Sequence, residues 1–273
     1  ETPGKVRVVF IAGPSSSGKT TFSKRLAVQL LANGIRPMPL GLDDYFVDRD
    51  RTPRDEQGEF DYETIRALDL DLFGDHLQSL IGGKPTSLPH YNFLTGQREA
   101  GQTVTLGGEH VIIVEGIHGL NPLLAQRLPA ETVFRVYVSA LTQLNLDRHN
   151  RVATSDCRLI RRVVRDAATR GYNATATLKR WDSVVRGEKH HIFCFQENAD
   201  AVFNSALVHE LAVLRPFAEL LLLQVRPDAP EFVESNRLLS FLTWFRPAQP
   251  EIVPDNSILR EFIGGSIFAR LRL

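Results

Sequence analysis

Hydrophobic residues gather in short continuous runs that are separated by longer segments of mixed polarity. Residues 6–12 (VRVVFIA), 110–116 (HVIIVEG) and 132–139 (TVFRVYVS) are such runs. Aliphatic and β-branched runs without polar alternation are typical of strands buried on both faces of a parallel sheet. Further strands are predicted at 37–42 and, as a short final one, at 200–203.

Between these runs the apolar positions recur at helical spacing. Residues 20–34 form such a segment and end in an Asn-Gly pair, a common C-terminal cap. We expect further helices at 62–81, over most of 142–187 and at 205–214. Strands that alternate with helices predict an α/β fold, with one parallel sheet and helices on both of its faces.

Three segments interrupt this alternation. Residues 85–106 are interpreted as a β-hairpin with its turn near Gly96, and the polar residues 47–60 as a surface loop. Residues 228–273 hold two helical stretches joined by a proline-bearing linker. We therefore expect a main domain over 1–227 and a C-terminal helical appendage packed on that same domain.

Composition narrows the class of protein. The chain has 273 residues, 43% of them hydrophobic, and a formal net charge of zero, which argues against a dedicated nucleic-acid binder. Cys157 and Cys194 form no CxxC pair, so neither a zinc site nor a disulfide framework is predicted. No apolar run approaches the ~20 residues of a membrane span, and there is no signal-peptide pattern. A cytoplasmic protein without a membrane partner is expected.

The clearest chemical signal lies between the first strand and the first helix. Residues 13–20 (GPSSSGKT) match the phosphate-binding pattern G-x-x-x-x-G-K-[ST] at every required position. Glycines let the backbone curl so that its N–H groups face phosphates, and the helix adds the positive end of its dipole. We predict that ATP is bound here, by Gly13, Ser15, Ser16, Ser17, Gly18, Lys19, Thr20 and Thr21.

Acidic residues at strand ends complete this site. Lys19 would bridge the β- and γ-phosphates, while Thr20 and Glu115 would hold Mg²⁺. Asp43 follows the second strand, where it could accept the proton of an attacking hydroxyl. The alternatives are that Glu115 is a solvated strand-end acid and that Asp43 and Asp44 only cap a loop.

A basic helix is the second strong pattern. Arg158, Arg161, Arg162 and Arg165 are spaced so that four guanidinium groups share one helix face. Like charges crowded in this way repel one another unless a polyanion neutralises them. We predict an arginine-rich helical lid over about 156–187 that closes on ATP. A salt-bridged face, with Asp166 as a partner, is the alternative.

Taken together, the motifs resemble a known family. They are GPSSSGKTT, LDDYF, GEFDYETIRALD, LPHYNFLTGQRE, VIIVEGIH and RRVVRDAATRG, in that order. Over about residues 6–205 they resemble the uridine kinase branch of the phosphoribulokinase/uridine kinase family. The resemblance implies a P-loop NTPase fold with a hairpin that binds substrate, and an ATP-dependent kinase whose acceptor is a small-molecule alcohol.

The resemblance also implies residue roles. The catalytic residues would be Asp43 as base, with Lys19, Arg165 and Arg170. Arg162 would contact the phosphates of ATP. Asp61 would grip two ribose hydroxyls, and the other substrate contacts would come from Phe46, Tyr91, Phe93 and Arg165.

Some positions depart from the family pattern. Gly96 stands where uridine kinases carry a His that reads the pyrimidine, Phe46 replaces a Tyr, and Arg180 replaces an expected Gln. An unpaired polar edge of a base costs about 1–3 kcal/mol, so tight pyrimidine selection is not predicted. The ending DNSILREFIGGS and the start at Glu1 resemble a kinase domain taken from a larger bacterial protein with an N-terminal TGS-type region.

Three functions remain open at this point. The first is phosphorylation of a nucleoside 5′-hydroxyl, as in uridine and cytidine kinases. The second is a kinase for another polyol, sugar or sugar phosphate, which the missing His at position 96 favours. The third is a nucleotide-dependent regulatory module of a fused protein. The oligomeric state is also open, with a homo-oligomer among the possibilities.

Overall fold

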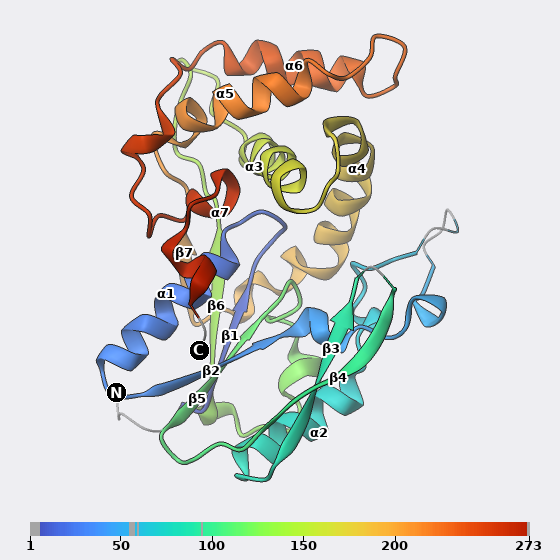
Figure 1. Ribbon diagram of the computed structural model, residues 1–273, viewed down its shortest axis with the longest axis vertical. Helices are drawn as coiled ribbons and strands as arrows, with labels where there is room; N and C mark the ends of the chain where they lie inside the picture. Colours follow the sequence, from blue (N-terminus) through green and yellow to red (C-terminus); the bar gives the residue numbers. More distant parts are fainter. Residues whose placement is uncertain (1–5, 55–57, 59, 94, 272–273) are drawn as a thin grey trace.

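A five-stranded parallel sheet forms the centre of the molecule (Figure 1). The computed structural model describes residues 6–54, 58, 60–93 and 95–271. The strand order is β2-β5-β1-β6-β7. Their bounds are β1 Val8–Ala12, β2 Arg36–Gly41, β5 His110–Glu115, β6 Val133–Ser139 and β7 Ala201–Asn204. Every one of the five predicted sheet strands is present, so the predicted α/β fold is confirmed.

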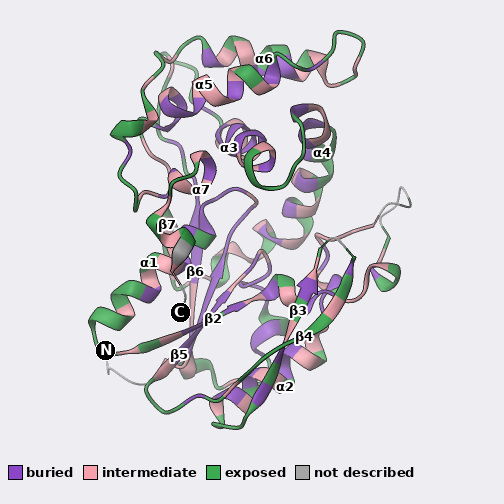
Figure 2. Cartoon of the chain, viewed as in Figure 1, coloured by how far each residue is buried: buried purple, intermediate pink, exposed green. Residues whose placement is uncertain are grey.

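The middle of the sheet is buried on both faces, as Figure 2 shows. In β1, Val8 pairs with Ile112 of β5 on one side and with Val133 of β6 on the other. Each residue of β1 is less than 10% exposed. The continuous apolar run at 6–12 is therefore explained by the position of β1, which has no face toward solvent.

The two faces of the sheet carry different helices. On one face Ile11 and Ile113 pack with Ala27 of α1 (Lys19–Ala32). On the other face Phe10 and Val114 share a cluster with residues of α2 (Leu70–Ile81) and of the hairpin. The hairpin consists of β3 (Thr86–Asn92) and β4 (Gln97–Val104), with a φ of 73° at Gly96 in its turn.

Helix boundaries differ from the expected ones at three places. The helix predicted at 62–81 begins only at Leu70, because the side chain of Asp69 caps it by accepting from the Leu72 N–H at 3.1 Å. The helix predicted at 205–214 is α5, Glu210–Leu222. Within 142–187, residues 142–153 are not helical; the helices there are α3 (Thr154–Thr169) and α4 (Ala174–His191).

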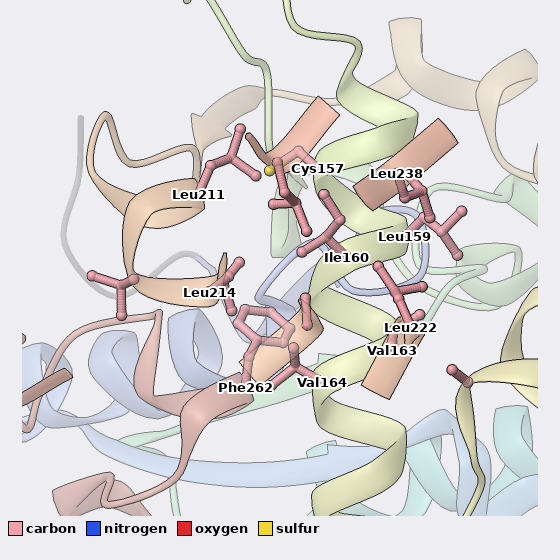
Figure 3. Close-up of a cluster of buried hydrophobic side chains, with 14 of the residues drawn as sticks. Cys157, Leu159, Ile160, Val163, Val164, Leu211, Leu214, Leu222, Leu238 and Phe262 are labelled. Carbon is pink, nitrogen blue, oxygen red and sulfur yellow. The ribbon is translucent and has the colours of Figure 1, made fainter. Parts of the chain in front are cut away.

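The C-terminal segment is integrated into the hydrophobic core. It contains α6 (Phe232–Leu242) and the short α7 (Arg260–Ile263). Leu238 and Phe262 belong to the same buried cluster as Cys157 and Ile160 of α3 (Figure 3), and Leu259 is a further member of that cluster. In Figure 1 this red segment runs from α6 past α7 to α1. No helix within the described residues is long and apolar enough to cross a bilayer.

This packing predicts that the tail contributes to global stability. Leu259 is fully buried, so Leu259→Ala should lower the free energy of unfolding by about 2–5 kcal/mol through the cavity it leaves. Ile252 in the same tail is 62% exposed and is the matched control, Ile252→Ala. Urea denaturation measures both. A tail that docks only loosely would give similar, small changes in the two variants.

Candidate active site

The phosphate loop requires glycine at two of its positions. Gly13 has a φ of 155°, and a Cβ there would lie 1.9 Å from the carbonyl oxygen of Val138. Gly18 has a φ of 87°, and a Cβ there would lie 2.6 Å from Ile258. A larger residue at either position would displace the loop. The pattern GPSSSGKT therefore has a steric basis in this fold.

Two arginines of α3 hold the phosphate loop in position. Arg158 forms a two-pronged ion pair with Glu188 of α4, at 2.6 and 2.7 Å, and also donates to the carbonyl of Ser15. Glu188 accepts from the Ser15 N–H at 2.8 Å. Arg161 pairs with Glu210 of α5 and donates to the carbonyl of Ser16. All four charged side chains are buried.

These pairs correct the interpretation of the basic helix. We expected four guanidinium groups on one face of α3 to await a polyanion. Arg158 and Arg161 are instead neutralised by Glu188 and Glu210, and they hold the loop rather than face a ligand. Opposite charges that are buried together are costly to separate, so both pairs fix the position of α3 against the loop.

The remaining lid arginines converge on a single carboxylate. Arg162 and Arg165 lie 3.3 and 2.7 Å from Asp166, and Arg170 lies 3.8 Å from it. Arg162 also donates to the Ser15 hydroxyl at 2.7 Å. Three cations that share one anion retain net positive charge beside the loop. This is the charge that a triphosphate can neutralise.

Lys19, Asp43 and Glu115 lie together at the carboxyl edge of the sheet. Desolvation by the surrounding protein raises the pKa of Asp43, although the residue remains partly exposed to solvent, and Lys19 and then Arg170 act in the opposite direction. Burial lowers the pKa of Lys19, while Glu115 and other carboxylates oppose this. Lys19 donates to the carbonyl of Pro14 within the loop, at 3.1 Å. The predicted catalytic residues Asp43, Lys19, Arg165 and Arg170 are thus within electrostatic reach of one another.

The neighbouring acid, Asp44, ties the hairpin to the end of β2. It accepts from the Tyr91 N–H at 3.1 Å and lies 3.1 Å from Nδ1 of His90. Asp44 therefore has the loop-fixing contacts that we considered for both Asp43 and Asp44.

Thr20 and Glu115 offer oxygen ligands that suit Mg²⁺. The Thr20 hydroxyl donates to Glu115 at 3.3 Å, so a hydroxyl and a carboxylate face each other beside Lys19. Burial raises the pKa of Glu115 to about 7. The described residues contain no cluster of three or more His, Cys, Asp or Glu that could hold a metal. Two protein oxygens fit Mg²⁺, which takes its other ligands from water and phosphate.

Asp61 lies beside a second acid that the sequence did not single out. Asp61 accepts from the N–H groups of Glu63 and Thr64, and His191 lies 3.9 Å from its other oxygen. Burial raises the pKa of Glu63 to about 7 against the effect of Arg162. Glu188, Asp61 and Lys19 also act on Glu63, so this pair of acids lies close to the phosphate loop.

An aromatic cluster lies between Asp61 and the hairpin. Phe46 contacts the rings of Tyr62, Tyr91 and Phe93, with centroids 5.6–6.4 Å apart. Tyr91 is almost fully buried, whereas Phe93 is 60% exposed. Of the three aromatics predicted to touch substrate, Phe93 is thus the one open to solvent. Tyr62 was not predicted.

Arg49 fills the space that Gly96 leaves. A Cβ on Gly96 would lie 2.7 Å from its guanidinium, which donates to the carbonyl of Phe93 at 2.7 Å. Nothing in the sequence pattern of the 47–60 loop singled out this residue. Arg180, the other departure near the lid, stacks 4.6 Å over the ring of Tyr172.

Thr21, the last residue predicted to bind ATP, is already bonded. Its N–H and hydroxyl both donate to Glu261 of α7, at 3.0 and 2.8 Å.

Comparison with known proteins identifies the family of this chain. The model of the phosphoribulokinase/uridine kinase family matches residues 8–212. A uridine kinase of Deinococcus deserti is 30% identical over 185 residues, which cover 67% of this chain and 80% of that protein. One of Staphylococcus aureus is 30% identical over 180 residues, or 66% of this chain and 77% of that protein.

The chain belongs to the phosphoribulokinase/uridine kinase family. It is accordingly an ATP-dependent kinase with a P-loop fold. A solved structure of a possible uridine kinase from Bacillus stearothermophilus is 24% identical, with a TM-score of 0.45, and covers 75% of this chain and 91% of that one. The family match ends at residue 212, so α6 and α7 lie beyond it.

Sequence reasoning missed the carboxylates that complete the site. Glu188, Glu210 and Glu261 lie 30, 49 and 240 residues from their partners Arg158, Arg161 and Thr21. No local spacing rule connects residues so far apart. The spacing of the four arginines on α3 indicates that acids are needed to neutralise them, but it does not identify which acids these are.

The raised pKa of Glu63 predicts a pH-dependent effect on stability. Its ordinary pKa is 4.5 and its folded pKa is about 7, so the folded state holds a proton that the unfolded state has lost between these values. Stability should therefore fall as pH rises from 4.5 to 7. Glu63→Gln should raise the melting temperature at pH 8 by about 2–4 °C, since part-exposed charges are screened, and should leave it unchanged at pH 4.

Glu131 is an exposed acid and supplies the control, Glu131→Gln. Melting curves at pH 4, 6 and 8 measure the effect. An equal change in melting temperature at pH 4 and pH 8 for Glu63→Gln would show that burial of charge is not its cause.

Proposed function

We propose that the chain transfers the γ-phosphoryl group of ATP to a hydroxyl of a neutral acceptor, the 5′-hydroxyl of a nucleoside. The carrying observation is the meeting of Lys19, Asp43 and Glu115 at one edge of the sheet. It brings a phosphate-binding cation, a candidate base and a candidate metal ligand to the same point. A module that only senses nucleotide does not require the base.

ATP would be held by the phosphate loop and the lid. The loop N–H groups and Lys19 would contact the β- and γ-phosphates, and Arg162, Arg165 and Arg170 would exchange Asp166 for the triphosphate. Thr20 and Glu115 would hold Mg²⁺, which neutralises charge on the phosphate oxygens when bound. The C-terminal half of α3, which carries these arginines, would cover the nucleotide and exclude water.

Asp43 would orient the acceptor hydroxyl and take its proton. Desolvation raises its pKa, which makes the carboxylate a stronger proton acceptor, while Lys19 and Arg170 limit the rise. Phosphoryl transfer depends chiefly on positioning and electrostatic stabilisation, so a carboxylate of moderate basicity suffices.

The charge of the acceptor side supports a neutral substrate. Asp61 and Asp43 lie on this side, and Glu63, whose pKa burial raises to about 7, adds its negative charge above that pH. An acceptor that carries its own phosphate or carboxylate would be repelled by these acids, whereas ribose hydroxyls can donate to Asp61. This favours a nucleoside over a sugar phosphate or a sugar acid.

The hairpin supports recognition of a base. The exposed ring of Phe93 offers a face for stacking. Arg49 beside it carries five N–H donors in a planar fork, more than its bond to Phe93 uses, and the carbonyl oxygens of a pyrimidine are acceptors. Arg49 would thus supply the donor that Gly96 lacks.

Removal of the base tests the chemistry. Asp43→Asn should lower kcat for uridine by about 10²–10⁴-fold and leave the Kd for ADP within twofold, because the amide cannot accept the proton. Asp50→Asn, on the exposed loop nearby, should change neither. An ADP-release assay and calorimetry measure the two quantities. If Asp43→Asn kept full turnover, Asp43 would not be the base.

A panel of acceptors tests the proposed substrate class. Uridine, cytidine and ribose are neutral, whereas ribose 5-phosphate and D-glycerate are anionic. We expect kcat/KM for the best nucleoside to exceed that of each anionic acceptor by at least about tenfold, which is about 1.4 kcal/mol in transition-state binding. A preference for the sugar phosphate or the acid would contradict the electrostatic argument.

A further inference from the structure

The tail reaches back to the end of the phosphate loop. Glu261, in α7, accepts two hydrogen bonds from Thr21 through one carboxylate oxygen, 3.0 Å from the N–H and 2.8 Å from the hydroxyl. Thr21 is the third residue of α1, and it is buried. Glu261 and Thr21 are 240 residues apart, so this contact joins the tail directly to the nucleotide-binding motif.

Neighbouring contacts hold Glu261 in place. Leu259 and Phe262 on either side of it are fully buried in the cluster around α3. The Arg260 guanidinium donates to the carbonyls of Val253 and Pro250, which closes the tail on itself. Ile258 packs against Gly18 of the loop. The carboxylate is therefore positioned by a packed segment rather than by a free chain end.

The site of this contact is one that attracts phosphate. The first N–H groups of a helix have no partner within the helix, and its dipole favours an anion there. Burial lowers the pKa of Lys19, whereas Glu115, Glu261 and Asp43 oppose that effect, so Glu261 also lies within electrostatic reach of the catalytic lysine. A carboxylate at this point both occupies donors and adds negative charge beside the triphosphate.

We propose that Glu261 sets the nucleotide affinity of this kinase by competing with a phosphate group of ATP for the two donors of Thr21. This inference rests on the proposed use of ATP in the phosphate loop. Without nucleotide, Glu261 caps α1 and stabilises the empty loop. Nucleotide binding displaces the carboxylate, and the tail thereby weakens binding. The same contact thus has opposite effects on the stability of the empty protein and on its affinity for nucleotide.

Two readouts separate this role from simple support of the loop. In Glu261→Gln the side chain keeps its shape but loses its charge. We expect the Kd for ADP, measured by calorimetry, to fall about tenfold, and the melting temperature of the nucleotide-free protein to fall as well. Glu251→Gln, an exposed acid in the same tail, is the control and should change neither quantity.

Glu261→Asp is the second variant, in case the amide impairs folding. Its shorter side chain retracts from Thr21, so ADP binding should tighten, though less than in Glu261→Gln. Unchanged or weaker ADP binding in both variants would overturn the proposal, since a carboxylate that only supports the loop would give that result. Turnover of uridine is measured in parallel, and its absence alongside tightened ADP binding would count against the proposed acceptor alone.

Discussion

Positive charge buried beneath the phosphate loop is the constraint on which this site depends. Arg158 and Arg161 of α3 are buried away from water, and each needs a carboxylate partner to offset the cost of desolvating its charge. Glu188 from α4 and Glu210 from α5 supply them. Glu188 also accepts from the Ser15 N–H, while Arg158 and Arg161 donate to the carbonyls of Ser15 and Ser16. The loop, α3, α4 and α5 are consequently tied into one electrostatic unit.

The charges that are only partly neutralised in this scheme are the ones proposed to bind ligands. Arg162, Arg165 and Arg170 share Asp166, an arrangement that a triphosphate can replace. Asp43 and Glu115 both act electrostatically on Lys19, so the proposed base and the proposed metal ligand lie near the cation that would contact the γ-phosphate. Buried pairs thus fix the geometry, and the shared or partly exposed charges are left for ligands.

Much of this architecture could be predicted from sequence because its causes are local. A strand buried on both faces is largely apolar along its length, which is why 6–12 and 110–116 were recognisable. The phosphate loop was equally evident, since Gly13 and Gly18 have no room for a side chain. The predicted start of α2 was wrong. Asp69 caps a helix that begins only at Leu70, and hydrophobic spacing does not reveal that cap.

The features that could not be predicted from the sequence are contacts between residues far apart along the chain. A row of arginines on α3 predicted repulsion or a polyanion, yet two of its members have buried partners on other helices. Gly96 suggested a gap in base recognition, while Arg49 from a distant loop fills that space. Glu261 reaches Thr21 only because the tail packs against α3. Each of these depends on tertiary packing.

The position of the transferred phosphoryl group tests the central claim most directly. Phosphorus NMR of a reaction containing uridine and Mg-ATP would follow the γ-phosphoryl group to its product. The account predicts a phosphomonoester resonance coupled to the two 5′ protons of the ribose. Release of inorganic phosphate alone, or a phosphomonoester on another hydroxyl, would contradict it.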